Sequence, residues 1–266
     1  MFYPDRSENA FSPRLSVLRA LNQHVAVTGS IYRAFRAPTL NELYRNFQVG
    51  NVFTLGNAAL AAEHLTGAEA GGKITGWNGK LDLRGTFFWS DIVDPVENVT
   101  VNPKSSPILA EKENLGRTRS RGLELDGVVH LDHHVQISAG YAYTDATVVQ
   151  FTSKVGPSLV GLDVPQVPRQ QFTWEARYWN PSRLLLSLQG RFVGQQFDDS
   201  LNQYLLARFY AMDLLIGRNV NRHVEVFAAA ENVTDKRYQV ARTPTLSVGP
   251  PILFRVGMRV EFPGRR

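Results

Sequence analysis

The stretch PILFRVGMRVEF, residues 251–262, decides the fold class. Successive side chains of an extended strand point to opposite faces. One face of this stretch is wholly apolar and comprises Ile252, Phe254, Val256, Met258, Val260 and Phe262. The other face comprises Arg255, Gly257, Arg259 and Glu261. Such a strand suits either the inner layer of a soluble sandwich or a position between a bilayer and a water-filled lumen.

The same alternation recurs in about eleven segments of roughly ten residues, the length that a tilted membrane-spanning strand needs. These segments are residues 15–21, 25–33, 63–74, 80–90, 116–131, 135–144, 171–179, 183–194, 207–219, 223–231 and 251–262. Short turns, such as the one at Asn78-Gly79, alternate with long connections, and aromatic residues lie near strand ends. Soluble sandwiches lack both regularities. The pattern therefore predicts an all-β fold, an antiparallel transmembrane β-barrel.

The number of strands indicates a fragment of such a barrel. Short turns are periplasmic and long loops extracellular, so the first strand runs inward and an odd number of strands ends in the periplasm. A complete bacterial barrel has an even number of strands with both ends periplasmic. An open sheet in lipid would also leave two edges of unpaired backbone groups. We therefore expect that this chain does not span a membrane alone.

Composition excludes several other classes. Apolar residues make up 43% of the 266 residues, which is enough for a core or a lipid face, and there is no cysteine for disulfides or thiol chemistry. No apolar run approaches the roughly 18 residues of a spanning helix. The net charge of +5 comes from basic residues spread singly, which gives no support for a nucleic-acid partner. Residues 1–10 lack a secretion signal, so an outer-membrane location requires a segment upstream.

The sequence shows no arrangement of catalytic residues, so we expect no enzymatic activity and no cofactor. The residues His130, Asp132, His133 and His134 suggest a metal site, but adjacent histidines on a strand point to opposite faces, and we expect none. Carboxylates in the outer loops, Asp91, Asp94, Asp198 and Asp199, either contact a cationic ligand or are simply solvated. Inward charges either bind an anionic ligand or, as we favour, hydrate the lumen: Arg84, Arg177, Arg191, Arg255, Arg259, Glu175 and Glu261.

Three ordered motifs carry a family resemblance. Residues 35–44 are FRAPTLNELY, which resembles a signature of TonB-dependent outer-membrane receptors. Asn57, Leu60 and Glu63 stand where that family has its "NPNLKPE" box, with alanines replacing other consensus positions, and Glu69 follows at the family's spacing. Residues 231–238, ENVTDKRY, resemble "ENLTDKRY", and Gly249-Pro250-Pro251 resembles the lead-in to the closing strand. The motif residues are Phe35, Arg36, Ala37, Pro38, Asn41, Glu42, Leu43, Tyr44, Asn57, Leu60, Glu63, Asn232, Asp235 and Tyr238.

The resemblance implies a barrel of 22 strands around an N-terminal plug. This chain, residues 1–266, would be strands 12 to 22, with the plug and the first barrel half absent. It also implies the outer membrane of a Gram-negative bacterium as location. The implied partners are outer-membrane lipid, the missing plug and barrel half, the TonB complex through that plug, and a small-molecule or metal-chelate ligand. Candidate ligand-binding residues in the loops and upper lumen are Tyr32, Arg36, Tyr44, Phe88 and Gln195.

The implied function is active import of a scarce ligand, such as a ferric siderophore, cobalamin or a similar chelate. Haem is disfavoured because residues 39–56 lack the histidine that the haem branch places there. The segments Arg36-Ala37-Pro38 and Asn41-Glu42 either fold over the ligand or, as we favour, pack against the barrel rim and plug, with Pro38 fixing φ and Asn41 capping a short helix. A non-transporting barrel remnant and a soluble all-β binding module remain alternatives.

Overall fold

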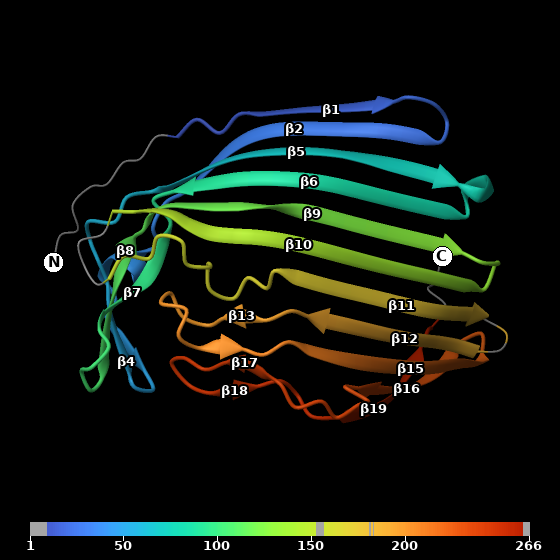
Figure 1. Cartoon of the computed structure of the whole chain (residues 1–266). Helices are drawn as coiled ribbons and strands as arrows, with labels where there is room; N and C mark the ends of the chain where they lie inside the picture. The colour runs from blue at the N-terminus through green and yellow to red at the C-terminus, as the bar shows by residue number, and fades with distance from the viewer. Residues whose placement is uncertain (1–9, 153–156, 181, 183, 263–266) are drawn as a thin grey trace.

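A computed structural model describes residues 10–152, 157–180, 182 and 184–262. Its largest element is an antiparallel sheet of 11 strands in chain order (Figure 1). The strands are β1 (Arg14–Ala20), β2 (Val25–Arg36), β5 (Glu63–Gly76), β6 (Leu81–Val93), β9 (Gly116–His130), β10 (Val135–Phe151), β11 (Gln170–Asn180), β12 (Leu184–Val193), β15 (Phe209–Asn221), β16 (Val224–Glu231) and β19 (Leu253–Val260). They confirm the eleven predicted segments, except that Arg183 lies outside the described residues.

The register of this sheet places apolar side chains in continuous rows on one face, here called the apolar face. One row joins five neighbouring strands through Leu125, Tyr141, Phe172, Phe192 and Tyr210. At the end of the sheet, Val256 of β19 pairs with Ala228 and is 85% exposed. The predicted alternation of the closing strand is therefore confirmed, and the apolar face presents exposed hydrophobic side chains.

The opposite face, here called the polar face, carries the charges. One row runs through Ser138, Glu175, Gln189 and Asp213. The predicted inward arginines within the strands share this face, and two of them form ion pairs: Arg255 with Glu231 at 3.1 Å and Arg259 with Glu225 at 3.3 Å. Water or a polar partner suits this face, because unpaired charges are costly in an apolar environment.

Tight turns join the strands at one end of the sheet, on the right of Figure 1. The turn predicted at Asn78-Gly79 is a 3₁₀ element, η1 (Trp77–Gly79), in which Asn78 has φ 56° and Gly79 φ 84°. At the turn after β9, the Asp132 carboxylate accepts the backbone N–H groups of His134 and Val135 at 2.6 and 2.7 Å. The polar residues of that segment therefore build a turn.

At the other end, segments expected to be loops form further structure. A second sheet of four strands has the order β3-β4-β8-β7, in which β4 and β8 are parallel. Its elements are β3 (Phe47–Val49), β4 (Val52–Leu55), β7 (Val96–Asn102) and β8 (Ile108–Asn114), with α1 (Leu40–Tyr44) before them. Two small hairpins add β13 (Gln196–Phe197), β14 (Leu205–Leu206), β17 (Gln239–Ala241) and β18 (Ser247–Val248). Sequence alternation misses these strands because all but β7 and β8 have only two to four residues, and because β4 and β8 pair across β5, β6 and β7.

Buried residues concentrate under this outer layer. One cluster consists of Val99, Leu115, Val148 and Leu159, and a second consists of Leu43, Leu60 and Val96. The first cluster joins the small sheet to β10, and the second joins α1 to the small sheet, which fixes the outer layer in place. Within the described part of the chain, no helix is long and apolar enough to cross a membrane.

Candidate functional site

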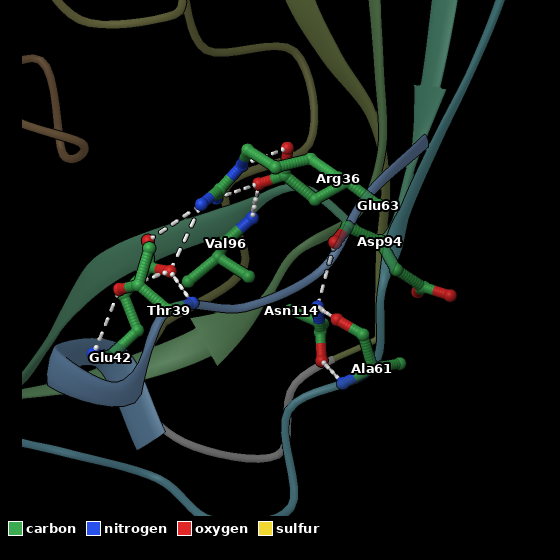
Figure 2. A network of polar contacts seen from close by, with 8 residues as sticks. All are labelled: Arg36, Thr39, Glu42, Ala61, Glu63, Asp94, Val96 and Asn114. Atoms are coloured by element: carbon green, nitrogen blue, oxygen red, sulfur yellow. Dashed lines mark hydrogen bonds and ion pairs between the residues drawn. The ribbon is translucent and has the colours of Figure 1, made fainter. Parts of the chain in front are cut away.

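Arg36, the last residue of β2, connects three segments at the outer end of the sheet (Figure 2). Its Nε donates to Glu63 Oε2 at 2.8 Å, its Nη2 donates to Glu63 Oε1, and its Nη1 reaches both carboxylate oxygens of Glu42 at 3.0 and 3.1 Å. Charge-assisted hydrogen bonds of this forked kind also fix geometry. The guanidinium group predicted as a candidate for ligand binding is thus held between two carboxylates.

The helix α1 begins with a capping box. Thr39 Oγ1 accepts the backbone N–H of Glu42 at 3.3 Å, and Glu42 Oε2 accepts the backbone N–H of Thr39 at 2.7 Å. The prediction that Asn41 caps the helix is therefore wrong, because Asn41 lies inside the helix and Thr39 is the N-cap. Burial alone would raise the pKa of Glu42, but hydrogen bonds from Arg36 and Thr39 outweigh it and lower this pKa.

Glu63 and two asparagines extend the same network to the small sheet. The Glu63 carboxylate accepts the backbone N–H of Val96 at 2.8 Å, beside its bonds to Arg36 (Figure 2). Asn114 donates to the carbonyls of Ala61 and Asp94 at 3.2 and 2.7 Å. In the same region Asn57 donates to the Lys112 carbonyl at 3.0 Å. The first two sequence motifs therefore contribute to one network of hydrogen bonds at the outer layer, here called the clamp. It comprises Arg36, Thr39, Glu42, Glu63 and Asn114.

The third motif also builds a local structure. Asn232 is 2% exposed, donates to the carbonyls of Lys236 and Pro250 at 3.0 Å each, and accepts the Lys236 N–H. The buried ring of Tyr238 stacks on Phe209 with centroids 3.9 Å apart, and its hydroxyl accepts a hydrogen bond from Arg191 at 2.8 Å. These contacts tie the loop before β19 to the upper end of β15.

The five candidate ligand residues are not brought together. Tyr32 and Phe88 share the polar face: the Tyr32 hydroxyl donates to Glu69 at 2.9 Å, and Phe88 pairs with Glu69 across β5 and β6. Arg36 is held in the clamp, and Tyr44 packs against its buried cluster. The fifth, Gln195, is exposed after β12. Their roles in binding stay predictions.

An open cavity of about 510 Å³ lies between the small sheet and three outer loops. One wall is a face of the small sheet, with Phe47, Val49, Val52 and Ile108 among its residues. The other wall comes from residues 165–166, 198–204 and 243–244. The volume lies within the range of about 300–1,000 Å³ typical of small-molecule sites. Sequence reasoning singled out only Asp198 and Asp199 of this lining, because its walls come from distant segments.

Asp198 organises the loop wall of the cavity. Its Oδ2 accepts the backbone N–H groups of Arg242 and Thr243 at 2.6 Å each, and its Oδ1 accepts Gln166 Nε2 at 2.7 Å. Burial raises the pKa of Asp198, but these hydrogen bonds outweigh burial and lower it. The carboxylate is therefore ionised at neutral pH. It holds the loops that contain Gln166 and Thr243 to its own loop.

The sequence matches the family described as TonB dependent receptor-like, beta-barrel, over residues 2–233. The chain belongs to this family. Its place is the outer membrane of a Gram-negative bacterium, as the resemblance implied.

Two curated relatives support this assignment. The chain is 29% identical over 136 residues to the ferrioxamine B receptor of Salmonella typhimurium, covering 48% of this chain and 19% of that receptor. It is 27% identical over 155 residues to the ferrichrome outer membrane transporter/phage receptor of Escherichia coli, covering 53% and 19%. The matched segment of this TonB-dependent receptor chain thus spans about a fifth of the length of each relative.

Solved structures of the family confirm the fold. The siderophore receptor PiuA from Acinetobacter baumannii aligns with a TM-score of 0.72 at 17% identity, over 93% of this chain and 35% of that one. The copper transporter OprC aligns with a TM-score of 0.73 at 17% identity, over 94% and 39%. The eleven-stranded sheet is thus a barrel wall.

Proposed function

We propose that this chain is the C-terminal part of the barrel, strands 12 to 22, of a receptor that imports a ferric siderophore or a similar chelate. Family membership over residues 2–233 is the observation that carries the proposal. The curated relatives are receptors or transporters for ferrioxamine B and ferrichrome. Transport draws energy from the TonB complex through a plug that precedes this chain. No enzymatic step is required of it.

The two faces of the long sheet fit this role. The apolar face contacts membrane lipid, since alternate apolar residues on each strand suit the hydrocarbon region. The polar face lines the lumen and contacts the plug. The edge strands β1 and β19 each have a single neighbour within the described sheet. Both run in the same direction, because ten antiparallel steps separate them. Neighbouring strands of the barrel are antiparallel, so β1 and β19 do not pair with each other, and the strands of the first barrel half lie between them.

Ligand enters at the outer end, where the cavity and the upper polar face lie. The clamp around Arg36 holds the outer layer that forms one wall of this cavity. Tyr32 and Phe88 then belong to the upper lumen, below the cavity. The cavity supplies a site of the right size, and the clamp keeps its shape.

The experiment is uptake by the full-length receptor in a strain that lacks its gene. Cells are offered ⁵⁵Fe bound to hydroxamate and catecholate chelates in turn, with and without an intact TonB gene. We expect uptake of at least one chelate that requires both the receptor and TonB. Uptake that is unchanged by deletion of the receptor, for every chelate, would contradict transport and favour the non-transporting remnant.

A further inference from the structure

We propose that the outer cavity selects ferric chelates by charge, so that it accepts neutral or positively charged hydroxamate-type chelates and discriminates against anionic ones. The inference rests on the proposed transport function and specifies its substrate class. It is carried by the composition of the two walls of the cavity.

The wall from the small sheet carries an apolar patch. Phe47 pairs with Thr54 in the sheet, and Val49 pairs with Val52, which pairs in turn with Ile108 of β8. These positions share one face of the small sheet, and that face borders the cavity. Hydrophobic contact with this wall suits the methylene chains that link the hydroxamate groups of a chelate.

The loop wall carries negative charge without a neutralising partner in contact. All the hydrogen bonds that Asp198 accepts come from neutral donors: the backbone of Arg242, the backbone and hydroxyl of Thr243, and the Gln166 amide. Neutral donors stabilise a carboxylate but leave its charge in place, so the field of Asp198 extends into the cavity.

Asp199 repeats this arrangement beside it. Its Oδ1 accepts the backbone N–H groups of Gln203 and Tyr204 at 2.9 and 2.7 Å, and its Oδ2 accepts that of Leu201 at 3.1 Å. Tyr204 and Leu201 also line the cavity. The loop wall therefore presents two adjacent carboxylates that only neutral groups contact.

Glu97 adds a third carboxylate on the sheet side. It lines the cavity from β7, and burial raises its pKa, with Lys112 acting in the opposite direction. Lys112 does not line the cavity, and Arg242 places its guanidinium over the ring of Tyr204 at 5.4 Å. None of the described residues that line the cavity is a lysine, arginine or histidine. An anionic chelate would thus meet like charge on the loop wall.

The test compares chelates that differ only in charge. Ferrioxamine B has a terminal ammonium group and a net charge of about +1, its N-acetyl derivative is about neutral, and its N-succinyl derivative is about −1, because each hydroxamate cancels one charge of Fe(III). Uptake of the three ⁵⁵Fe forms is measured with the full-length receptor in cells that lack other routes for them. A triply anionic ferric tris-catecholate completes the panel.

We expect the positive and neutral forms to be taken up at least about tenfold faster than the succinylated form. Asp199→Asn should reduce this ratio about threefold or more. The matched control is Glu111→Gln, because Glu111 pairs with Val99 and Leu55 and does not line the cavity. Since both forms are compared on the same cells, a change in receptor amount leaves the ratio unaltered.

Three results would overturn the inference in distinguishable ways. If the succinylated form or the tris-catecholate is imported as fast as ferrioxamine B, charge selection is wrong and transport stands. If the receptor is present in the outer membrane and imports no chelate of the panel, the proposed function fails and charge selection fails with it. A ratio that Asp199→Asn leaves unchanged would exclude the cavity as its source.

Discussion

Arg36 at the end of β2 donates hydrogen bonds to Glu63, the first residue of β5, and to Glu42 on α1. A single guanidinium group thus closes the connection of residues 37–62, which contains α1, β3 and β4. The two carboxylates are 16% exposed, whereas the arginine side chain is 43% exposed. The closing contact is therefore open to solvent on its basic side and sheltered on its acidic side.

Arg36→Gln should loosen this connection. The change leaves Glu42 and Glu63 as neighbouring sheltered carboxylates without a cation, and lost charge-assisted hydrogen bonds cost about 2 kcal/mol. Amide hydrogen exchange of the full-length receptor should show faster exchange in α1 and β4, and little change in β9 or β10. Arg45→Gln is the control, because Arg45 is exposed just after α1. Equal increases of amide exchange in the two variants would show that the contacts of Arg36 do not hold this connection.

The stability of α1 should depend on pH through Glu42. Its pKa is lowered in the folded chain, so its contribution is fully present above the unfolded pKa of about 4.3 and is lost as pH falls through the folded value. Proteolysis within residues 37–62 should therefore accelerate below about pH 4. In Glu42→Gln this acceleration should disappear, since no titrating group remains in the capping box. A variant with an unchanged pH profile would contradict the assignment.

The long sheet was predictable and the outer layer was not. Alternation along each long strand, together with turn residues such as Asn78 and Gly79, determines pairing between neighbours in the sequence. β4 instead pairs with β8, so that Val52 meets Ile108 across the whole of β5, β6 and β7. No local pattern encodes such a contact, and strands of three or four residues show too few alternations to detect.

In the candidate site, too, local sequence patterns predict one part and long-range packing decides the other. Thr39-Leu40-Asn41-Glu42 contains the S/T-x-x-E pattern of a capping box, so this pattern favours Thr39, the observed N-cap, over Asn41. The cavity was not visible, because Val49, Asp199 and Thr243 come from three separate segments. Long-range packing, and not residue type, decides which loop carboxylates line the cavity.

Gly249→Ala should destabilise the loop before β19. A Cβ at this position would overlap the ring of Tyr238, which is stacked on Phe209 and bound by Arg191. Displacing that ring from a packed site costs about 1–3 kcal/mol. The melting temperature of the purified full-length receptor should fall. Gly29→Ala serves as control, since a Cβ there meets only the Glu69 carbonyl oxygen at 3.8 Å. A similar fall in both variants would refute the specific role of Tyr238.

A matched pair of substitutions on β10 tests which face of the sheet contacts lipid. Ala139 pairs with Gly127 and Trp174 on the apolar face, and Ala142 pairs with Glu124 and Gln171 on the polar face. Ala139→Arg should lower the free energy of unfolding of the full-length receptor in phospholipid vesicles by about 2–4 kcal/mol, the cost of an arginine near the bilayer midplane.

Ala142→Arg should change that free energy little, because the new cation lies beside Glu124 in a hydrated lumen. Both variants alter the same strand, the same residue type and the same net charge, so only the face differs. The measurement is denaturant unfolding followed by tryptophan fluorescence. Equal losses of stability would mean that both faces are dry or both are wet, and either result is incompatible with a barrel wall. A larger loss at Ala142 would reverse the two faces.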